Sequence, residues 1–357
     1  MSAPIAIVTG SGGLIGSESV RSLAREGFDV IGIDNDLRAS FFGPAATTSH
    51  TTAELVDTVD AFRPLDLDIR DRDGIERVIR EAGPALELVV HTAAQPSHDW
   101  AARDPHTDFG VNATGTLNLL EALRQHRPGA TFVFTSTNKV YGDRPNFLPL
   151  EEHDLRLDLP ESHEWFSGVT TEMSLDHTTH SLFGVSKVAA DLMVQEYGRY
   201  FDMPTVCFRG GCLTGPQHAG AELHGFLSYL VKCAVTGTPY TVFGHDGKQV
   251  RDNIHSYDVV QAFLAFHRAP KAAAVYNLGG GRESNISMRE AVLKCEAMTG
   301  RPMNIRFDGP PRIGDHRWWI SDLSAFKADY PEWGLTRSMD EVLAEIHQAA
   351  VAATAAA

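Results

Sequence analysis

Short apolar runs alternate with longer amphipathic stretches along the first 210 residues of the chain. Such runs, bounded by Gly, Asp and small residues, are typical of buried strands, whereas apolar positions spaced three and four apart are typical of helices. The pattern predicts strands at residues 5–9, 30–34, 65–69, 86–94, 131–136 and 205–209. It predicts helices at residues 14–26, 105–126 and 183–201, and one beginning near Arg70. This alternation indicates an α/β fold with a doubly wound parallel sheet, a Rossmann fold.

Beyond residue 210 the pattern changes to shorter, mixed elements. Helices are predicted near residues 223–236, 257–268 and 288–299, and strands at residues 240–243 and 275–278. We therefore expect residues 1–210 to form a nucleotide-binding domain, and residues 211–350 to form mainly a smaller cap with some segments returning to the main sheet. Residues 35–53 are expected to be a surface loop, and residues 143–179 an irregular insertion. The Ala-rich residues 349–357 are expected to be the fraying end of a helix.

A glycine-rich turn joins the first predicted strand to the first predicted helix. Gly10, Gly13 and Gly16 allow a sharp turn, a close approach of the backbone to a pyrophosphate and tight packing of the helix on the strand. The free amides at the helix start, from Leu14 and Ile15 onward, attract phosphates, aided by the helix dipole. The turn predicts a dinucleotide-binding site.

Asp34 ends the second strand at the spacing expected for an adenosine ribose ligand. Its carboxylate accepts hydrogen bonds from the ribose and repels a 2′-phosphate, so the predicted cofactor is NAD rather than NADP. The neighbouring Asn35 is a further cofactor-binding candidate. Asp68, at the end of the third strand, is expected to meet the adenine amino group, with Ile69 against the ring. An equally good alternative is that Asp68 caps the helix beginning near Arg70.

The fourth strand ends in small residues on which a cofactor can lie flat. Ala93 and Ala94 are therefore cofactor-binding candidates, and so is Gln95 in the loop that follows, because open α/β sheets bind ligands at the carboxyl ends of their strands. Asn112 lies in the middle of a predicted helix, where Asn is a poor helix former. A buried hydrogen-bonding role near the cofactor is the expected reason.

Charge and cysteine content narrow the class of partner. Lys and Arg number 31 against 46 Asp and Glu, a formal charge of −15, which argues against nucleic acid or an anionic membrane as the main partner. Four Cys residues without a CxxC pair or metal-like spacing indicate reduced thiols, no metal site and a cytoplasmic location. No apolar run reaches membrane-spanning length.

The glycine fingerprint, the strand-end Thr137 and Lys187 within Ser181-Leu-Phe-Gly-Val-Ser-Lys187 resemble the extended short-chain dehydrogenase/reductase family over nearly the whole chain. Members are NAD-dependent epimerases, dehydratases and decarboxylases of nucleotide sugars. The blocks at residues 136–142, 247–252 and 315–317 look most like the CDP-paratose 2-epimerase (tyvelose epimerase) branch. The resemblance implies that a sugar carbon is oxidised to a ketone by bound NAD, after which the hydride returns to the opposite face.

Three positions are implied to carry this chemistry: Thr137, Phe183 and Lys187. Thr137 offers a hydroxyl to a substrate oxygen. In the family the lysine holds the nicotinamide ribose and lowers the pKa of a tyrosine four residues earlier, which is the acid/base. Here that position is Phe183, which transfers no proton. Another group takes over, or the protein binds NAD and a nucleotide sugar without turnover, or Phe183 is a substitution engineered to trap a complex.

The candidate replacements for the tyrosine are groups that titrate and that the pattern places near the strand ends. They are Lys187, His180, Tyr141, Cys212 and His98. Dehydratases of the family place Asp-Glu after the strand-end Thr, whereas this chain has Asn138-Lys139, so a dehydratase is disfavoured. A decarboxylase or dehydrogenase of the same family stays open.

The cap is expected to bind the nucleotide end of the substrate. Arg251, in a segment expected at a sheet edge, and Arg317 have fork geometry suited to a diphosphate. Their alternative role is surface ion pairing with Asp252 and Asp315. The candidate substrate-binding residues are Gln95, Thr137, Asn138, Lys139, Cys212, His224, Arg251 and Arg317. The family also implies a homodimer or higher homo-oligomer, with the helices near residues 112–126 and 183–201 packing against their copies, although core packing explains their apolar faces equally well.

Overall fold

A computed structural model of the chain describes residues 3–218, 225–307 and 314–355. The chain divides into two compact units, each built from separate segments. The first comprises Met1–Val140, Leu182–Arg209 and Val259–Tyr276. The second comprises Tyr141–Ser181, Gly210–Asp258 and Asn277–Ala357.

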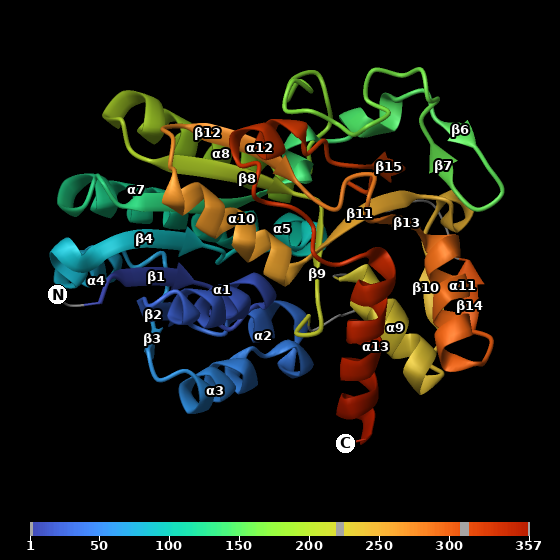
Figure 1. Cartoon of the computed structure of the whole chain (residues 1–357), viewed down its shortest axis with the longest axis horizontal. Coiled ribbons are helices and arrows are strands. Elements are labelled where there is room, and N and C mark those ends of the chain that lie inside the picture. Colours follow the sequence, from blue (N-terminus) through green and yellow to red (C-terminus); the bar gives the residue numbers. More distant parts are fainter. Residues whose placement is uncertain (1–2, 219–224, 308–313, 356–357) are drawn as a thin grey trace. The chain divides into compact units, whose positions relative to one another are not determined.

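The central sheet has seven strands in the order β12-β8-β5-β4-β1-β2-β3 (Figure 1). The pairs from β5 through β3 are parallel. Strand order reverses between β1 and β4, which is the doubly wound arrangement predicted from the sequence. The strands are β1 (Ile5–Thr9), β2 (Asp29–Asp34), β3 (Phe62–Asp66), β4 (Leu86–His91), β5 (Thr131–Thr137), β8 (Thr205–Gly210) and β12 (Ala274–Leu278).

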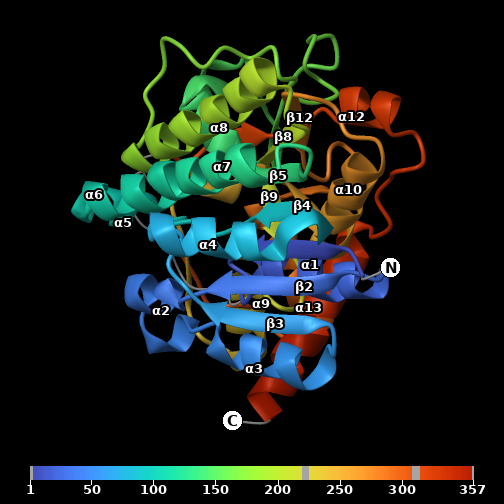
Figure 2. The same ribbon diagram turned by 90° about the vertical axis from the view of Figure 1, so that its left-hand side faces the viewer.

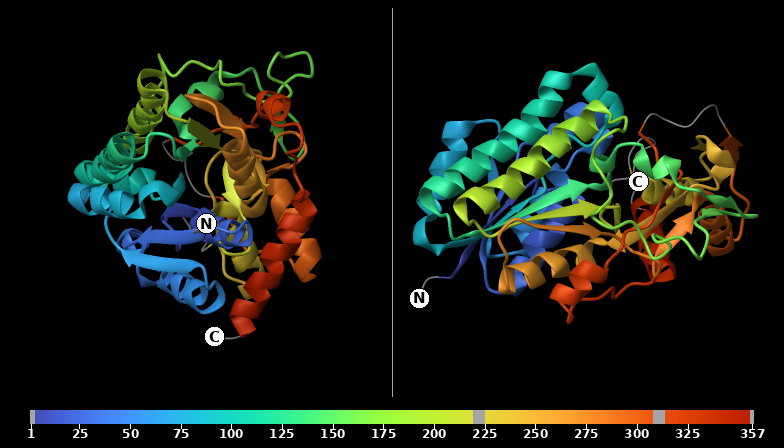
Figure 3. Two further views of the ribbon diagram at one scale, coloured as in Figure 1. Left: turned by 60° about the vertical axis from the view of Figure 1, so that its left-hand side comes forward. Right: turned by 90° about the horizontal axis from the view of Figure 1, so that it is seen from above.

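Amphipathic helices connect these strands and bury their apolar sides. They are α1 (Leu14–Arg25), α2 (Leu37–Phe42), α3 (Ser49–Thr58), α4 (Arg72–Ala82), α5 (His98–Arg103), α6 (Pro105–Phe109), α7 (Gly115–His126), α8 (Leu182–Phe201) and α10 (Ser256–Arg268). Helices α4, α7 and α8 pack side by side (Figure 2), and α7 and α8 run alongside one another over most of their lengths (Figure 3). Their apolar residues form one core with β1, β2, β4 and β5.

Two expectations for the region after β2 are wrong. Residues 35–53 are not a loop, because α2 and the first part of α3 occupy much of this segment. Asp36 starts α2, and its carboxylate accepts from the hydroxyls of Thr47 and Thr48 and from the backbone amide of Thr48, which holds the turn between the two helices. Asp68 does not cap α4, since Asp71 is the N-cap and accepts a hydrogen bond from the amide of Gly74 at 3.0 Å.

In its described residues the second unit combines short strands with four helices, and three of these helices enclose a separate apolar core. Its strands are β6 (Glu151–Glu152), β7 (Leu157–Asp158), β9 (Cys212–Thr214), β10 (Tyr240–Val242), β11 (Val250–His255), β13 (Asn285–Ser287), β14 (Ile305–Phe307) and β15 (Trp318–Trp319). Its helices are α9 (Phe226–Thr236), α11 (Met288–Thr299), α12 (Ser324–Asp329) and α13 (Met339–Ala355), of which α9, α11 and α13 enclose the core. No described helix is both long enough and apolar enough to cross a bilayer.

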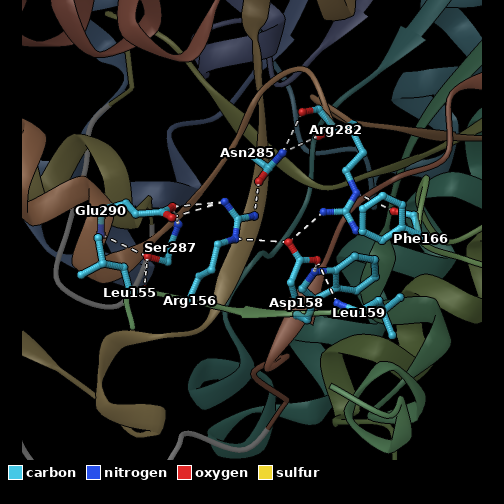
Figure 4. A network of polar contacts seen from close by, with 11 residues as sticks. Leu155, Arg156, Asp158, Leu159, Phe166, Arg282, Asn285, Ser287 and Glu290 are labelled. Carbon is cyan, nitrogen blue, oxygen red and sulfur yellow. Dashed lines mark hydrogen bonds and ion pairs between the residues drawn. The ribbon is translucent and has the colours of Figure 1, made fainter. Parts of the chain in front are cut away.

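A network of two arginines fastens the insertion before α8 to this unit (Figure 4). Arg156 contacts Glu290 of α11 at 3.3 Å and Asn285 of β13 at 2.5 Å. Arg282 donates to the carboxylate of Asp158 at 2.8 Å, and Arg156 also lies 3.3 Å from that carboxylate. The insertion is irregular, as predicted, because side-chain bonds rather than a long strand ladder hold it.

Arg251 does not lie at a sheet edge. Its strand, β11, pairs with β13, β15 and β9, so it is the most interior strand of the smaller sheet. The sequence around Arg251 is polar, which is typical of an edge. The neighbouring Asp252 and Asn253 are nevertheless fully buried, at 0% exposure each.

Candidate functional site

The glycine turn lies at the point where strand order reverses. Gly10 has φ +68°, and a Cβ at this residue would lie 2.8 Å from the amide nitrogen of Ala93, which follows the neighbouring strand β4. A Cβ on Gly16 would lie 2.0 Å from the carbonyl oxygen of Gly10. Side chains are therefore excluded at both positions, and the backbone of the turn is left open to a ligand.

The start of α1 is arranged to receive an anion. Gly13 is the N-cap, no side chain caps the helix, and its first turn carries no acidic residue. The amides of Leu14, Ile15 and Gly16 head this helix, where unpaired donors and the helix dipole favour phosphate. The hydroxyl of Ser11 in the same turn is buried and has no hydrogen-bond partner within the described structure.

Asp34 is held at the carboxyl end of β2 by two backbone amides. Gly12 donates to one carboxylate oxygen and Asp36 to the other, each at 2.9 Å. Burial raises the pKa of Asp34, while these amide bonds act to lower it. Each carboxylate oxygen can accept a second hydrogen bond, so the group can still bind a diol.

Asp68 and Asn35 form a second polar group beside the ends of β2 and β3. The Asn35 side-chain amide donates to Asp68 at 3.0 Å, and the Arg70 guanidinium, which binds the same carboxylate, lowers the pKa of Asp68. The side chain of Ile69 is buried in the core, against the position where a Cβ on Gly115 would lie.

Asn112 is buried and hydrogen-bonded, as its place within a helix predicted, and its bonds connect three elements. It lies in a π-helical turn, Gly110–Thr114, between α6 and α7. Its carbonyl oxygen accepts from the backbone amide of Gln95 at 3.0 Å, and its amide donates to the carbonyl of Gln95, to Asp108 and to Ser186, each at 3.0 Å. The loop after β4 is thereby bonded to α8.

Asp108 and Ser186 were not among the candidates from the sequence. Asp108 is 1% exposed and accepts from the Gln95 side chain at 2.7 Å as well as from Asn112. Burial raises the pKa of Asp108. Its spacing from Asn112 could have identified Asp108, because a residue four positions earlier in a helix lies on the same helix face.

Lys187 is 3% exposed and points at the end of β5. Its ammonium donates to the carbonyl oxygen of Thr135 at 2.8 Å and lies 4.1 Å from the ring centroid of Phe134. Burial lowers the pKa of Lys187 from 10.5 to about 8, although Asp191, Cys207 and Asp108 act to raise it. The lysine is thus a buried, easily deprotonated cation at the strand end.

Thr137 ends β5, two residues beyond the Lys187 contact. Its hydroxyl accepts a hydrogen bond from the amide of Lys139 at 3.2 Å, and Asn138 and Lys139 lie in the single helical turn that follows. Asn138 is buried, whereas Lys139 is partly exposed.

Phe183 begins the turn of α8 that carries Lys187 and is 6% exposed. Its ring contacts the imidazole of His98 edge to face, with centroids 5.1 Å apart. Tyr141 is fully buried, and its hydroxyl donates to the Asn277 side chain at 2.8 Å.

Arg251 and Arg317 extend from the same face of two adjacent strands. Arg251 pairs with Trp319 in parallel β15, and Arg317 precedes Trp319 by two residues, so both side chains project to one side. Neither guanidinium makes an ion pair with any residue that the structure describes. Arg251 does not pair with Asp252, because Asp252 turns to the opposite face and accepts from the Ser321 amide at 2.8 Å.

The two remaining substrate candidates belong to the second unit. Cys212 lies in β9, opposite Asn253 of β11, and is partly exposed. His224 lies outside the described residues.

Comparison with known proteins defines the class. A sequence model described as "NAD dependent epimerase/dehydratase family" matches residues 6–279. The chain is 30% identical to CDP-paratose 2-epimerase of Salmonella typhi over 89% of this chain and 90% of that protein. It is 28% identical to UDP-glucose 4-epimerase of Mycolicibacterium smegmatis over 87% of each. Among solved structures, UDP-glucose 4-epimerase of Thermus thermophilus in complex with NAD aligns with a TM-score of 0.76 and 25% identity over 97% of this chain and 98% of that one.

The chain therefore belongs to the NAD-dependent epimerase/dehydratase family, the extended short-chain dehydrogenases/reductases. Its fold is the one that the sequence predicted, and its cofactor is NAD. The described residues fit this cofactor, because the turn excludes side chains at Gly10 and Gly16, the start of α1 is uncapped, and Asp34 lies where an adenosine ribose is expected. Which residues touch NAD stays a prediction.

Proposed function

We propose that the protein is an NAD-dependent nucleotide-sugar epimerase, and specifically a 2-epimerase of a CDP-sugar. A sugar carbon is transiently oxidised to a ketone and then reduced from its other face, with no net redox change. NAD, when bound, supplies the reversible oxidation. The proposal is supported by the 30% identity to CDP-paratose 2-epimerase over most of both chains.

The observation that carries a catalytic role is the burial of Lys187 at the end of β5. A cation that is 3% exposed, and whose pKa burial lowers to about 8, costs stability. Groups perturbed in this way concentrate at working sites. We assign Lys187 to the nicotinamide ribose and Thr137 to a substrate oxygen, with Phe183 in place of the family's tyrosine.

The remaining residues are proposed to bind either NAD or the nucleotide-sugar substrate. The turn and strand-end residues hold NAD: Gly10, Gly13, Leu14, Ile15, Gly16, Asp34, Asn35, Asp68, Ile69, Ala93, Ala94, Gln95 and Asn112. Gln95, Asn138, Lys139, Cys212 and His224 contact the sugar or its nucleotide. Arg251 and Arg317, which make no ion pair among described residues, bind the diphosphate through charge-assisted hydrogen bonds.

The test is a screen of CDP-, UDP-, GDP- and dTDP-sugars with the purified protein, reading the product by NMR of the sugar protons. We expect bound NAD in the preparation, inversion at C2 of a CDP-sugar and no accumulation of NADH. Lys187→Ala is expected to abolish the inversion. Accumulated NADH would instead identify a dehydrogenase, and release of CO₂ a decarboxylase. If no sugar is changed, the epimerase proposal is wrong.

Phe183 favours a second candidate function, a protein that binds NAD and a nucleotide sugar without turnover. Phe183→Tyr distinguishes the two. A large gain of activity from an inactive parent supports the disabled site, whereas a neutral or harmful effect on an active parent supports a different proton path.

We further propose a homodimer formed through α7 and α8. Leu117, Val185 and Leu192 are exposed to 38%, 46% and 44%. Val185 and Leu192 are seven residues apart and therefore share one face of α8. Light scattering with size-exclusion chromatography is expected to give twice the chain mass, and Leu192→Glu to give the monomer. A monomeric parent would contradict this assembly.

A further inference from the structure

The ring contact between His98 and Phe183 lies where the family's proton-transferring tyrosine is missing. On the basis of the proposed epimerase function, we propose that His98 is the acid/base of this protein. In this assignment His98 performs the proton transfers, and Phe183 is an apolar wall that positions the imidazole.

Two features of the contact support this assignment. The imidazole and the Phe183 ring meet edge to face with centroids 5.1 Å apart, so the imidazole touches the side chain that stands in place of the tyrosine. Phe183 is also one helical turn before Lys187, so the same face of α8 presents the lysine and the ring that His98 touches.

The segment that carries His98 is held firmly. Gln95 is 0% exposed and exchanges hydrogen bonds between its backbone and the Asn112 side chain, and its own side chain binds the amide and the carbonyl of Ser97. The Ser97 hydroxyl caps α5 by accepting from Trp100 at 3.2 Å. His98 is the first residue of α5, so its backbone is fixed at the site.

Asn112 joins this segment to the helix of Phe183 and Lys187. Its side-chain amide donates to Ser186, while the same group binds Gln95. The position of His98 relative to α8 is therefore set by a buried hydrogen-bond network, which is what a proton-transferring group requires.

Two of the other candidate groups, Tyr141 and Lys187, already donate hydrogen bonds within the protein. Tyr141 is fully buried and donates its hydroxyl to Asn277. Lys187 donates to the carbonyl oxygen of Thr135, so its ammonium is engaged with the end of β5. His98 touches the Phe183 ring, at the position of the missing tyrosine.

The proposed steps balance. During oxidation the sugar hydroxyl would give its proton to a neutral imidazole nitrogen of His98, and the C–H hydrogen would leave with two electrons to NAD, when bound, so that the carbon becomes a ketone. Once the keto sugar has rotated in the site, the other face of its carbon would take back that hydrogen with its electron pair. The imidazolium of His98 would return the proton to the oxygen. Imidazole suits both directions because its ordinary pKa is near neutral pH.

The decisive experiment compares four proteins: wild type, His98→Ala, Phe183→Tyr and the double variant. His106→Ala is the control, since His106 is an exposed histidine on the neighbouring helix α6. With the sugar that wild type converts, we expect His98→Ala to lower kcat about 100-fold. We expect added imidazole to restore activity roughly tenfold, and Phe183→Tyr to restore it about as much in the His98→Ala background. NAD content and melting temperature should match wild type, and His106→Ala should be fully active.

A second readout does not depend on turnover. The ring-proton NMR signal of His98, assigned by its absence in His98→Asn, should shift when the nucleotide sugar is added, and the His106 signal should not. An active wild type with an equally active His98→Ala overturns the inference and leaves the epimerase proposal intact. An unchanged His98 signal, or lost activity that neither imidazole nor Phe183→Tyr restores, also overturns it. A wild type that holds NAD but converts no sugar overturns the proposed function itself.

Discussion

The ammonium of Lys187 donates a hydrogen bond to the backbone carbonyl of Thr135, 2.8 Å away. This bond joins α8 to β5 at the strand end where Thr137 lies. A single carbonyl compensates only part of the cost of burying the charge, which is why burial lowers the pKa of Lys187 to about 8. The lysine is therefore a source of pH-dependent stability in the protein without NAD.

The first prediction concerns that pH dependence. In the unfolded chain the Lys187 amine keeps its proton up to its ordinary pKa of 10.5, whereas in the folded protein the pKa is about 8. Between these values the unfolded state binds more protons, so raising the pH favours folding. Urea unfolding of NAD-free protein should show wild type gaining roughly 3 kcal/mol relative to Lys187→Met between pH 8 and pH 10.5. A difference that stays constant with pH would contradict it.

The second prediction concerns the glycine turn. Gly16→Ala would place a Cβ 2.0 Å from the carbonyl oxygen of Gly10, a backbone atom that cannot move aside cheaply. We expect this variant to lose bound NAD and to melt several degrees below wild type. Gly129→Ala is the matched control, because no atom lies within 4 Å of its Cβ. Retention of NAD by Gly16→Ala would refute the assignment of the turn.

The third prediction concerns the choice of dinucleotide. Asp34→Asn removes a charge that repels a 2′-phosphate and weakens hydrogen bonds to a ribose. Charged hydrogen bonds contribute about 1.5–3 kcal/mol, so NAD affinity should fall at least tenfold, and the preference for NAD over NADP should shrink. Calorimetric titration with both dinucleotides measures this. Asp29→Asn, at the exposed start of the same strand, should leave both affinities unchanged.

The fourth prediction concerns the arginine pair. Arg251→Met and Arg317→Met should each weaken binding of CDP by about tenfold or more, since each removes a charge-assisted contact to a phosphate. NAD content should not change. Arg306→Met, on an exposed position of β14 in the same unit, is the control. Equal CDP affinity in Arg251→Met and wild type would remove these residues from the substrate site.

The sequence predicted the parallel sheet well because its signals are local. The apolar run before Gly10 predicts a buried strand, and the polar residue at its end predicts that the chain turns there. The same holds for the apolar run before Asp34. A hydrogen bond between residues far apart in the sequence leaves no local pattern, which is why Asp108 was missed as a partner of Gln95. The polar strand around Arg251 was likewise misplaced at an edge, because the strands that cover it lie 35 to 68 residues further on.

The chain changes compact unit after Val140, Ser181, Arg209, Asp258 and Tyr276. The edge strand β12, Ala274–Leu278, is therefore the last strand of the central sheet to be synthesised, whereas the strand that leads into the glycine turn is the first. On the ribosome, β8 must wait with an unpaired edge while more than sixty further residues are synthesised. An unpaired edge is where strands of other chains add. During this interval the unpaired edge of β8 offers other chains a place to add a strand, so we expect the nascent protein to be prone to aggregation then.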